Sequence, residues 1–205
     1  MSAMTTGSTS RADVNRRRIL DVALAELLRD PDASMDQIAR AAGVVRRTVY
    51  GHFPSREALI STLVDEAVLA LATAHAAGRD GVADPAEAVA RSVLAVWEIA
   101  DRYRLLVSLA QRTVSMEGIR ERLTPVRESA AGLLQRGLDE GVFASPLPAP
   151  ALAYVKEQIL FALMEAVNDG LLDPREAGRT AAVTVLTAAG LPASLAAALV
   201  ARISD

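Results

Sequence analysis

The segment from about residue 45 to 53 gathers the side chains of this chain that are best suited to contact nucleic acid. Arginine supplies positive charge for phosphates and paired donors for guanine, hydroxyls and imidazole bond phosphate oxygens, and apolar groups contact thymine methyls. The next predicted helix begins with an arginine beside unpaired backbone N–H groups, which together suit a phosphate. The candidate DNA-contacting residues are Ser34, Val45, Arg46, Arg47, Thr48, Tyr50, His52 and Arg56. Which of them reads a base and which holds a phosphate stays open.

Two short helices must position these side chains, and the sequence marks both of them. Ser34, with a glutamine three residues later, forms a capping-box pattern that begins the first helix. Gly43 provides the backbone freedom that a sharp turn needs. In the second helix, Val49 and Phe53 are four residues apart on one face and are expected to pack inward. The polar residues between them then point elsewhere.

The spacing of three residues indicates a helix-turn-helix. In that motif the fifth position must be small, the ninth must tolerate the turn, and the fifteenth must be a compact hydrophobe. Counted from Met35, these positions are Ala39, Gly43 and Val49. The alternative is an ordinary helical hairpin with a solvated basic face, which would give Tyr50 no role.

The wider segment GVVRRTVYGHFPSREAL resembles the DNA-binding signature of TetR-type transcriptional regulators. In that family the second helix ends in Tyr-x-x-Phe and runs almost directly into a fourth helix that begins Ser-Lys-Glu. The resemblance covers about residues 16 to 63, and one position departs from it: Val45 stands where the family usually has Ser or Thr as the helix cap. The matching residues here are Tyr50, Phe53, Ser55, Arg56 and Glu57.

The resemblance implies an all-α protein with about nine or ten helices. A three-helix helix-turn-helix DNA-binding domain would occupy 11–54, after a disordered arm at 1–10. A helical ligand-binding and dimerisation domain would occupy 55–205. The resemblance further implies a homodimeric repressor that binds a palindromic double-stranded DNA operator and is released by a small-molecule effector.

Composition sets the outer bounds on function. The chain has 205 residues, 51% of them hydrophobic, and no cysteine, which excludes disulfides and thiol chemistry and fits a reducing cytoplasm. The net charge of -3 is unevenly spread, because residues 1–60 hold nine arginines against seven acidic residues. The helix-turn-helix end is therefore the positive end, which supports contact with DNA phosphates. Lys156 is the only lysine.

Apolar periodicity and capping residues predict further helices along the chain. Pro125 should either kink the predicted segment 117–140 or restart it with Thr124 as cap. The uncharged stretch 180–201 is long enough to cross a bilayer, but it is broken at 190–192 and is interpreted as two helices that do not enter a membrane. Residues 1–10 lack the features of a signal peptide, so a cytoplasmic location is expected. The predicted segments are 11–28, 55–75, 85–102, 103–114, 117–140, 151–168 and 175–189.

The helix at 151–168 is apolar around most of its circumference, so it must be buried on two sides. The second covering surface is predicted to be another subunit, and a central core helix is the alternative. The following helix offers small residues that would allow close approach. The predicted dimer-interface residues are Val155, Ile159, Ala162, Ala166, Ala181, Val185 and Ala188.

Large or adaptable side chains behind the DNA-binding segment are candidates for an effector pocket. An ordinary core role is the alternative for each of them. Because aromatic residues make up 3% of the chain, the effector is expected to be mainly apolar, contacted by aliphatic side chains with one or two polar anchors. The candidate pocket residues are Trp97, Tyr103, Met116, Phe161 and Met164.

No pattern for catalysis, a metal or a cofactor is present in the sequence. It lacks a nucleophile elbow and a phosphate-binding glycine loop, and His52 and His75 are too far apart in sequence to suggest a metal site. The chain is therefore expected not to be an enzyme. A helical protein-interaction module, whose basic helix binds a protein instead of DNA, is the alternative function, and the salt dependence of duplex binding separates the two.

Overall fold

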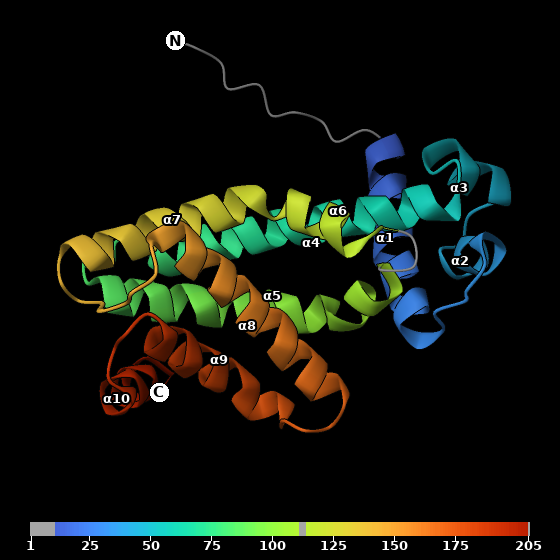
Figure 1. Ribbon diagram of the computed structural model, residues 1–205. Coiled ribbons are helices and arrows are strands. Elements are labelled where there is room, and N and C mark those ends of the chain that lie inside the picture. Colours follow the sequence, from blue (N-terminus) through green and yellow to red (C-terminus); the bar gives the residue numbers. More distant parts are fainter. Residues whose placement is uncertain (1–10, 111–113, 205) are drawn as a thin grey trace, which may run out of the picture. The chain divides into compact units, whose positions relative to one another are not determined.

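The computed structural model describes residues 11–110 and 114–204, and within these residues every regular element is a helix (Figure 1). The all-α prediction is confirmed, and the predicted disordered arm at 1–10 lies outside the described residues. The helices are α1 Arg11–Arg29, α2 Met35–Ala41, α3 Arg46–His52, α4 Arg56–Arg79, α5 Pro85–Ala110, α6 Met116–Arg122, α7 Thr124–Asp139, α8 Ala149–Asn168, α9 Pro174–Ala188 and α10 Ala193–Ser204.

The chain forms two compact units. Among the described residues, unit 1 comprises 11–64, 106–110 and 114, and unit 2 comprises 65–105 and 115–204. The compact N-terminal unit therefore extends beyond the predicted boundary after Pro54, because it includes the first part of α4 and the end of α5. Both long helices contribute to both units.

Unit 1 is built by α1, α2 and α3, with α2 packed against the other two. The capping box at the start of α2 is formed as predicted: Ser34 Oγ accepts the Gln37 backbone N–H at 3.3 Å, and the Ser34 N–H donates to Gln37 Oε1 at 2.7 Å. The apolar faces meet in one core. Its buried members include Ile19, Leu20, Ala23, Leu27, Ile38, Ala39, Ala42, Val49 and Phe53.

The turn between α2 and α3 depends on Gly43, whose φ of 64° lies in the left-handed region. Its N–H donates to the carbonyl of Arg40 at 3.1 Å, and the Val44 N–H donates to the carbonyl of Ala39 at 3.0 Å. These two bonds form a Schellman motif, which satisfies the last carbonyls of α2 while the chain reverses. A side chain at 43 would be strained, and its Cβ would lie 2.9 Å from the Arg18 guanidinium.

Unit 2 contains a second core, in which α8 packs against both α7 and α9, and α9 packs against α10 (Figure 1). Two helices of this unit begin with an Asp-Pro pair, and in both the aspartate acts as a cap. Asp84 accepts the Glu87 N–H at 2.7 Å, and Asp173 accepts the Arg175 N–H at 2.9 Å. Each cap satisfies a backbone donor that would otherwise lack a partner at the helix start.

Two predicted helix boundaries are wrong. Residues 103–110 continue α5, because no glycine or proline interrupts the chain between Pro85 and Ala110. The 117–140 segment restarts as α7, which is one of the two outcomes predicted for Pro125, but Thr124 is the first helical residue instead of the cap. Pro125 fits there because the first turn of a helix needs no intrahelical N–H bonds.

The dimer-interface prediction is wrong for Ala181 and Val185, which are 0% and 2% exposed within the single chain. The small-residue face of α9 is used inside unit 2, where these residues join its core. Ala162 and Ala188 are exposed. The half-buried members of the predicted set, still accessible to a partner, are Val155, Ile159 and Ala166.

Among the described helices, α4 has the length and hydropathy of a membrane-spanning segment. This is weak evidence, because a core helix of a globular protein meets the same criterion. Asp65 lies in the body of α4 and pairs with Arg122 at 2.7 Å, an exposed ion pair that would be costly in a bilayer. The stretch 180–201 is divided between α9 and α10, as predicted.

Gly137 in α7 is expected to be essential for packing. A Cβ at this position would lie 2.3 Å from the ring of Phe143, which is 3% exposed. We predict that Gly137→Ala lowers the free energy of unfolding by about 1–3 kcal/mol through overpacking. Thermal or urea unfolding of the full chain measures this.

Gly132→Ala in the same helix is the matched control. A Cβ there meets nothing within 4 Å, so alanine should raise stability by about 0.5–1 kcal/mol. Equal effects of the two substitutions would contradict the packing assigned to Gly137.

Candidate nucleic-acid interface

The helix α3 is buried on one side and exposed on the other. Val49 and Phe53 are 0% and 2% exposed, whereas Arg46, Arg47 and Tyr50 lie on the surface. The inward packing expected from the i, i+4 spacing is therefore present. An exposed basic helix held by a rigid turn can enter the major groove of DNA, which is wide enough to admit an α-helix.

Arg46 is held by contacts that the sequence did not indicate. Its Nη1 donates to Asp36 Oδ2 at 2.9 Å, and its guanidinium lies 5.1 Å from the centroid of the Tyr50 ring. The ion pair is exposed, so it contributes at most about 1 kcal/mol and can be exchanged for a phosphate or a base. The contact between the Arg46 guanidinium and the Tyr50 ring orients these two side chains together on the outer face of α3.

Arg47 differs from Arg46 in its side-chain contacts. It is exposed, and among the described residues it forms neither an ion pair nor a hydrogen bond. Thr48 and His52 are half-buried at the edges of the same helix. Within this segment Arg47 is thus the cation most available to a DNA phosphate or guanine.

The start of α3 lacks a side-chain cap, as the departure at Val45 predicts. Val45 is the N-cap residue in extended conformation, accepts no hydrogen bond through its side chain and is 68% exposed. The first N–H groups of α3 are therefore left to solvent or to a ligand. At a helix N-terminus these groups also favour an anion.

Two predicted contact residues have other partners. The guanidinium of Arg56 donates to the carbonyls of Ala33, at 3.3 Å through Nε, and of Pro31. Its donors therefore satisfy the α1–α2 loop, and the expected outward position toward a phosphate is not observed. The hydroxyl of Ser34 is used in the capping box, where it also donates to Gln37 Oε1 at 2.7 Å.

The helix α1 contributes arginines near α3 that were not among the predicted DNA-contacting residues. Arg16 lies with its guanidinium 5.6 Å from the centroid of the Phe53 ring, and the Arg18 guanidinium lies beside Gly43. No sequence period links these pairs, because the partners are more than 20 residues apart. The helix-turn-helix geometry brings them together, which adds α1 cations to the surroundings of α3.

The predicted effector-pocket residues are only partly gathered. Trp97 and Met164 belong to the core of unit 2, and Phe161 packs against that core. Tyr103 and Met116 are not part of this cluster. Trp97 also lines a groove of about 830 Å³ formed with α9, where it lies against Gly178. Within the described residues, no three His, Asp or Glu side chains gather as metal ligands would.

Comparison with known proteins places this geometry among DNA-binding regulators. Residues 19–63 match the family model described as bacterial regulatory proteins, tetR family. The regulator EthR of Mycobacterium tuberculosis is 42% identical over 64 residues, which cover 29% of this chain and 30% of that protein. The repressor LfrR of Mycolicibacterium smegmatis is 38% identical over 79 residues, which cover 38% and 41%. The matches thus span less than half the length of these relatives.

Solved structures extend the similarity of fold to most of the chain. LfrR, solved in complex with proflavine, has a TM-score of 0.68 at 21% identity and covers 87% of this chain and 98% of its own. The fatty acid degradation regulator FadR from Bacillus halodurans has a TM-score of 0.74 at 19% identity, with 88% and 97% covered.

The fold of unit 1 and the exposed α3 define a helix-turn-helix DNA-binding unit. The matched N-terminal segment and the all-helical fold are similar to those of the TetR family of bacterial regulatory proteins.

The uncapped start of α3 generates a stability prediction. Val45→Ser places a hydroxyl where it can accept an N–H of the first turn, so the free energy of unfolding should rise by about 1 kcal/mol. Urea denaturation of the full chain measures the change. Val44→Ser is the neighbouring control; it occupies a half-buried position that is not the cap and should be neutral or destabilising. A fall in stability for Val45→Ser would show that the cap geometry is wrong.

Proposed function

We propose that this protein is a homodimeric repressor that binds a palindromic DNA operator through α3 and is released by a small-molecule effector. The observation that carries the proposal is the two-sided character of α3. Its hydrophobes are fixed in the core of unit 1, while Arg46, Arg47 and Tyr50 are exposed on a helix whose axis is held by the Gly43 turn.

The half-buried and exposed residues of α8 support a dimer. Val155, Ile159, Ala162 and Ala166 offer apolar surface to a second copy. Two α3 helices must meet half-sites about one helical turn apart, or a multiple of it, so a dimer and a palindrome go together. The proposed location is the bacterial cytoplasm, where the operator is.

The effector is proposed to be mainly apolar, with one or two polar anchors in unit 2. It must bind one arrangement of the two DNA-binding units more tightly than the other, because a ligand with equal affinity for both shifts nothing. LfrR was solved in complex with proflavine, and FadR is described as a fatty acid degradation regulator, which concerns those proteins alone.

Arg47 provides the direct test of DNA recognition. We predict that Arg47→Ala weakens binding to a duplex selected from the source genome by about 1–3 kcal/mol, measured by fluorescence anisotropy at fixed salt. Arg175→Ala removes the same charge from an exposed position on α9 and should leave the affinity unchanged.

Salt dependence separates the repressor from a protein-interaction module. The affinity for the duplex should fall steeply as the salt concentration rises. In a plot of log affinity against log salt concentration, each neutralised phosphate contributes about -0.9 to the slope. Equal affinity of Arg47→Ala and the unaltered protein, together with a shallow slope, would contradict α3 as the DNA-contacting helix.

The dimer is tested at Ala162. Size-exclusion chromatography with light scattering should give twice the chain mass of 21.6 kDa. Ala162→Glu places two like charges at the proposed interface and should yield the monomer with an intact helical spectrum. Ala198→Glu, at an exposed position on α10, is the control and should remain a dimer. A monomeric unaltered protein would contradict the proposal.

A further inference from the structure

A carboxylate on α2 contacts the exposed side of α3 and has no role in the function proposed so far. Asp36 lies in the first turn of α2, and its Oδ2 accepts a hydrogen bond from Arg46 Nη1 at 2.9 Å. A negative charge beside a DNA-contacting helix is unfavourable for binding, because it repels the phosphates. Asp36 therefore opposes binding to DNA in general, and it can help only by improving discrimination between sequences.

The carboxylate of Asp36 depends on Arg46. Among the described residues, Arg46 is its hydrogen-bonding partner, ten residues further along the chain. The second oxygen, Oδ1, is buried and has no partner at hydrogen-bond distance in the described part of the chain. Because a buried acceptor without a partner is costly, the bond at Oδ2 favours a state in which Asp36 and Arg46 stay paired.

Tyr50 is a second contact of the Arg46 guanidinium. Arg46 Nη2 donates to the Tyr50 hydroxyl at 3.4 Å, and the guanidinium lies 5.1 Å from the centroid of the ring. The two residues are four positions apart and therefore share one face of α3. Each terminal nitrogen of Arg46 thus has a fixed partner, so the guanidinium plane is restrained although the side chain is 65% exposed. A restrained plane favours recognition of a base edge.

The restrained guanidinium still has free donors. Arginine carries more N–H groups than the contacts with Asp36 and Tyr50 use. In the major groove guanine offers two acceptors, O6 and N7, and a bidentate pair of arginine with both is the commonest specific contact. Arg46 can therefore bind a guanine while its pair with Asp36 is kept.

A phosphate and a guanine differ in how they respond to this pair. A phosphate carries a full negative charge, so Asp36 repels it and competes with it for Arg46. A guanine edge carries no net charge and is not repelled in this way. The exposed pair is weak enough to be exchanged, but only the phosphate requires the exchange. Asp36 thus disfavours contacts to phosphates, which are the same in every sequence, more than contacts to guanine.

We propose that Arg46 reads a guanine in each operator half-site, and that Asp36 is the positioning residue that directs Arg46 to the base instead of a phosphate. Tyr50 completes the restraint on the guanidinium. This inference rests on the proposed function and deepens it, because it assigns one base of the operator and one residue of α2 to recognition by α3.

The base contact is tested with 7-deazaguanine, which lacks the N7 acceptor and still pairs with cytosine. The duplex is the one selected from the source genome, and its guanines are replaced one position at a time, in both half-sites together. Fluorescence anisotropy with the full-length protein should show a loss of affinity of about tenfold or more at one position, as expected for a charged hydrogen bond. Arg46→Ala should remove this loss.

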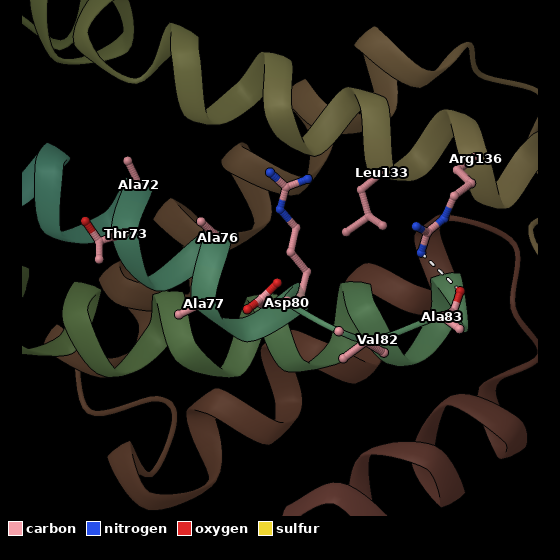
Figure 2. Close-up of a pocket in the computed structure, with 11 residues that line it drawn as sticks. Ala72, Thr73, Ala76, Ala77, Asp80, Val82, Ala83, Leu133 and Arg136 are labelled. Atoms are coloured by element: carbon pink, nitrogen blue, oxygen red, sulfur yellow. Dashed lines mark hydrogen bonds between the residues drawn. The ribbon is translucent and has the colours of Figure 1, made fainter.

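Arg136 provides the matched control for Arg46. It lies on α7 in unit 2, where it extends into a groove of about 950 Å³ and its Nη2 donates to the carbonyl of Ala83 at 3.2 Å (Figure 2). Like Arg46 it is paired with an exposed carboxylate, because its Nε lies 3.7 Å from Glu140. Arg136→Ala should keep the loss that 7-deazaguanine causes. A loss that persists in Arg46→Ala, or the absence of any sensitive guanine, would overturn the proposal.

The positioning role is tested with Asp36→Asn, which removes the charge with little change of shape. Specificity is measured as the ratio of the affinities for the selected duplex and for a duplex of the same composition in scrambled order. The ratio should fall about fivefold, the largest effect expected of an exposed ion pair, mainly because the affinity for the scrambled duplex rises. Asp36→Glu keeps a carboxylate and should keep most of the ratio.

A second aspartate separates this role from a general effect of charge. Asp32 is exposed in the α1–α2 loop and forms no ion pair within the described residues. Asp32→Asn removes the same charge, so it should raise both affinities by a similar factor and leave the ratio unchanged. A ratio in Asp36→Asn equal to that of the unaltered protein would overturn the positioning role, since a merely structural effect changes both affinities together.

The proposed function and this inference fail separately. A protein that binds no selected duplex would contradict both of them. Operator binding that requires Arg47 but responds neither to 7-deazaguanine nor to Asp36→Asn would contradict this inference alone.

Discussion

The close approach of α2 and α3 is the constraint on which the DNA-binding unit depends. A small residue at Ala39 and the left-handed Gly43 allow the chain to reverse within a few residues, and Val49 then fills the space between the helices. Because the inner face of α3 is fixed in this way, its outer face has one orientation. A functional helix held on a rigid support loses little freedom on binding, which favours specific recognition.

Charge is distributed differently in the two units. In unit 1 the arginines around α3 are exposed, where hydration makes a weak pair such as Arg46–Asp36 easy to exchange for DNA. In unit 2 most arginines of the described residues pair with carboxylates, whereas Lys156 is 7% exposed, and its burial without an ion pair costs stability.

Local signals in the sequence were enough for much of the fold. The capping residues Ser34, Asp84 and Asp173 and the turn at Gly43 depend on neighbours a few residues away, so their roles were predictable. Two other features could not be predicted: the hydrogen bond from Arg56 to the α1–α2 loop and the burial of Ala181. Each depends on partners from distant segments. His75 was considered only as a metal ligand, and its hydrogen bond to Ser92, 17 residues away, has no sequence period.

The central claim is that two copies of α3 read two half-sites. Selection of bound fragments from the source genome, followed by hydroxyl-radical footprinting, tests it most directly. The account predicts an enriched inverted repeat with two protected patches, centred about one helical turn apart or a multiple of it, and loss of both patches for Arg47→Ala. Enrichment of no common sequence, or a footprint unchanged by the substitution, would contradict it.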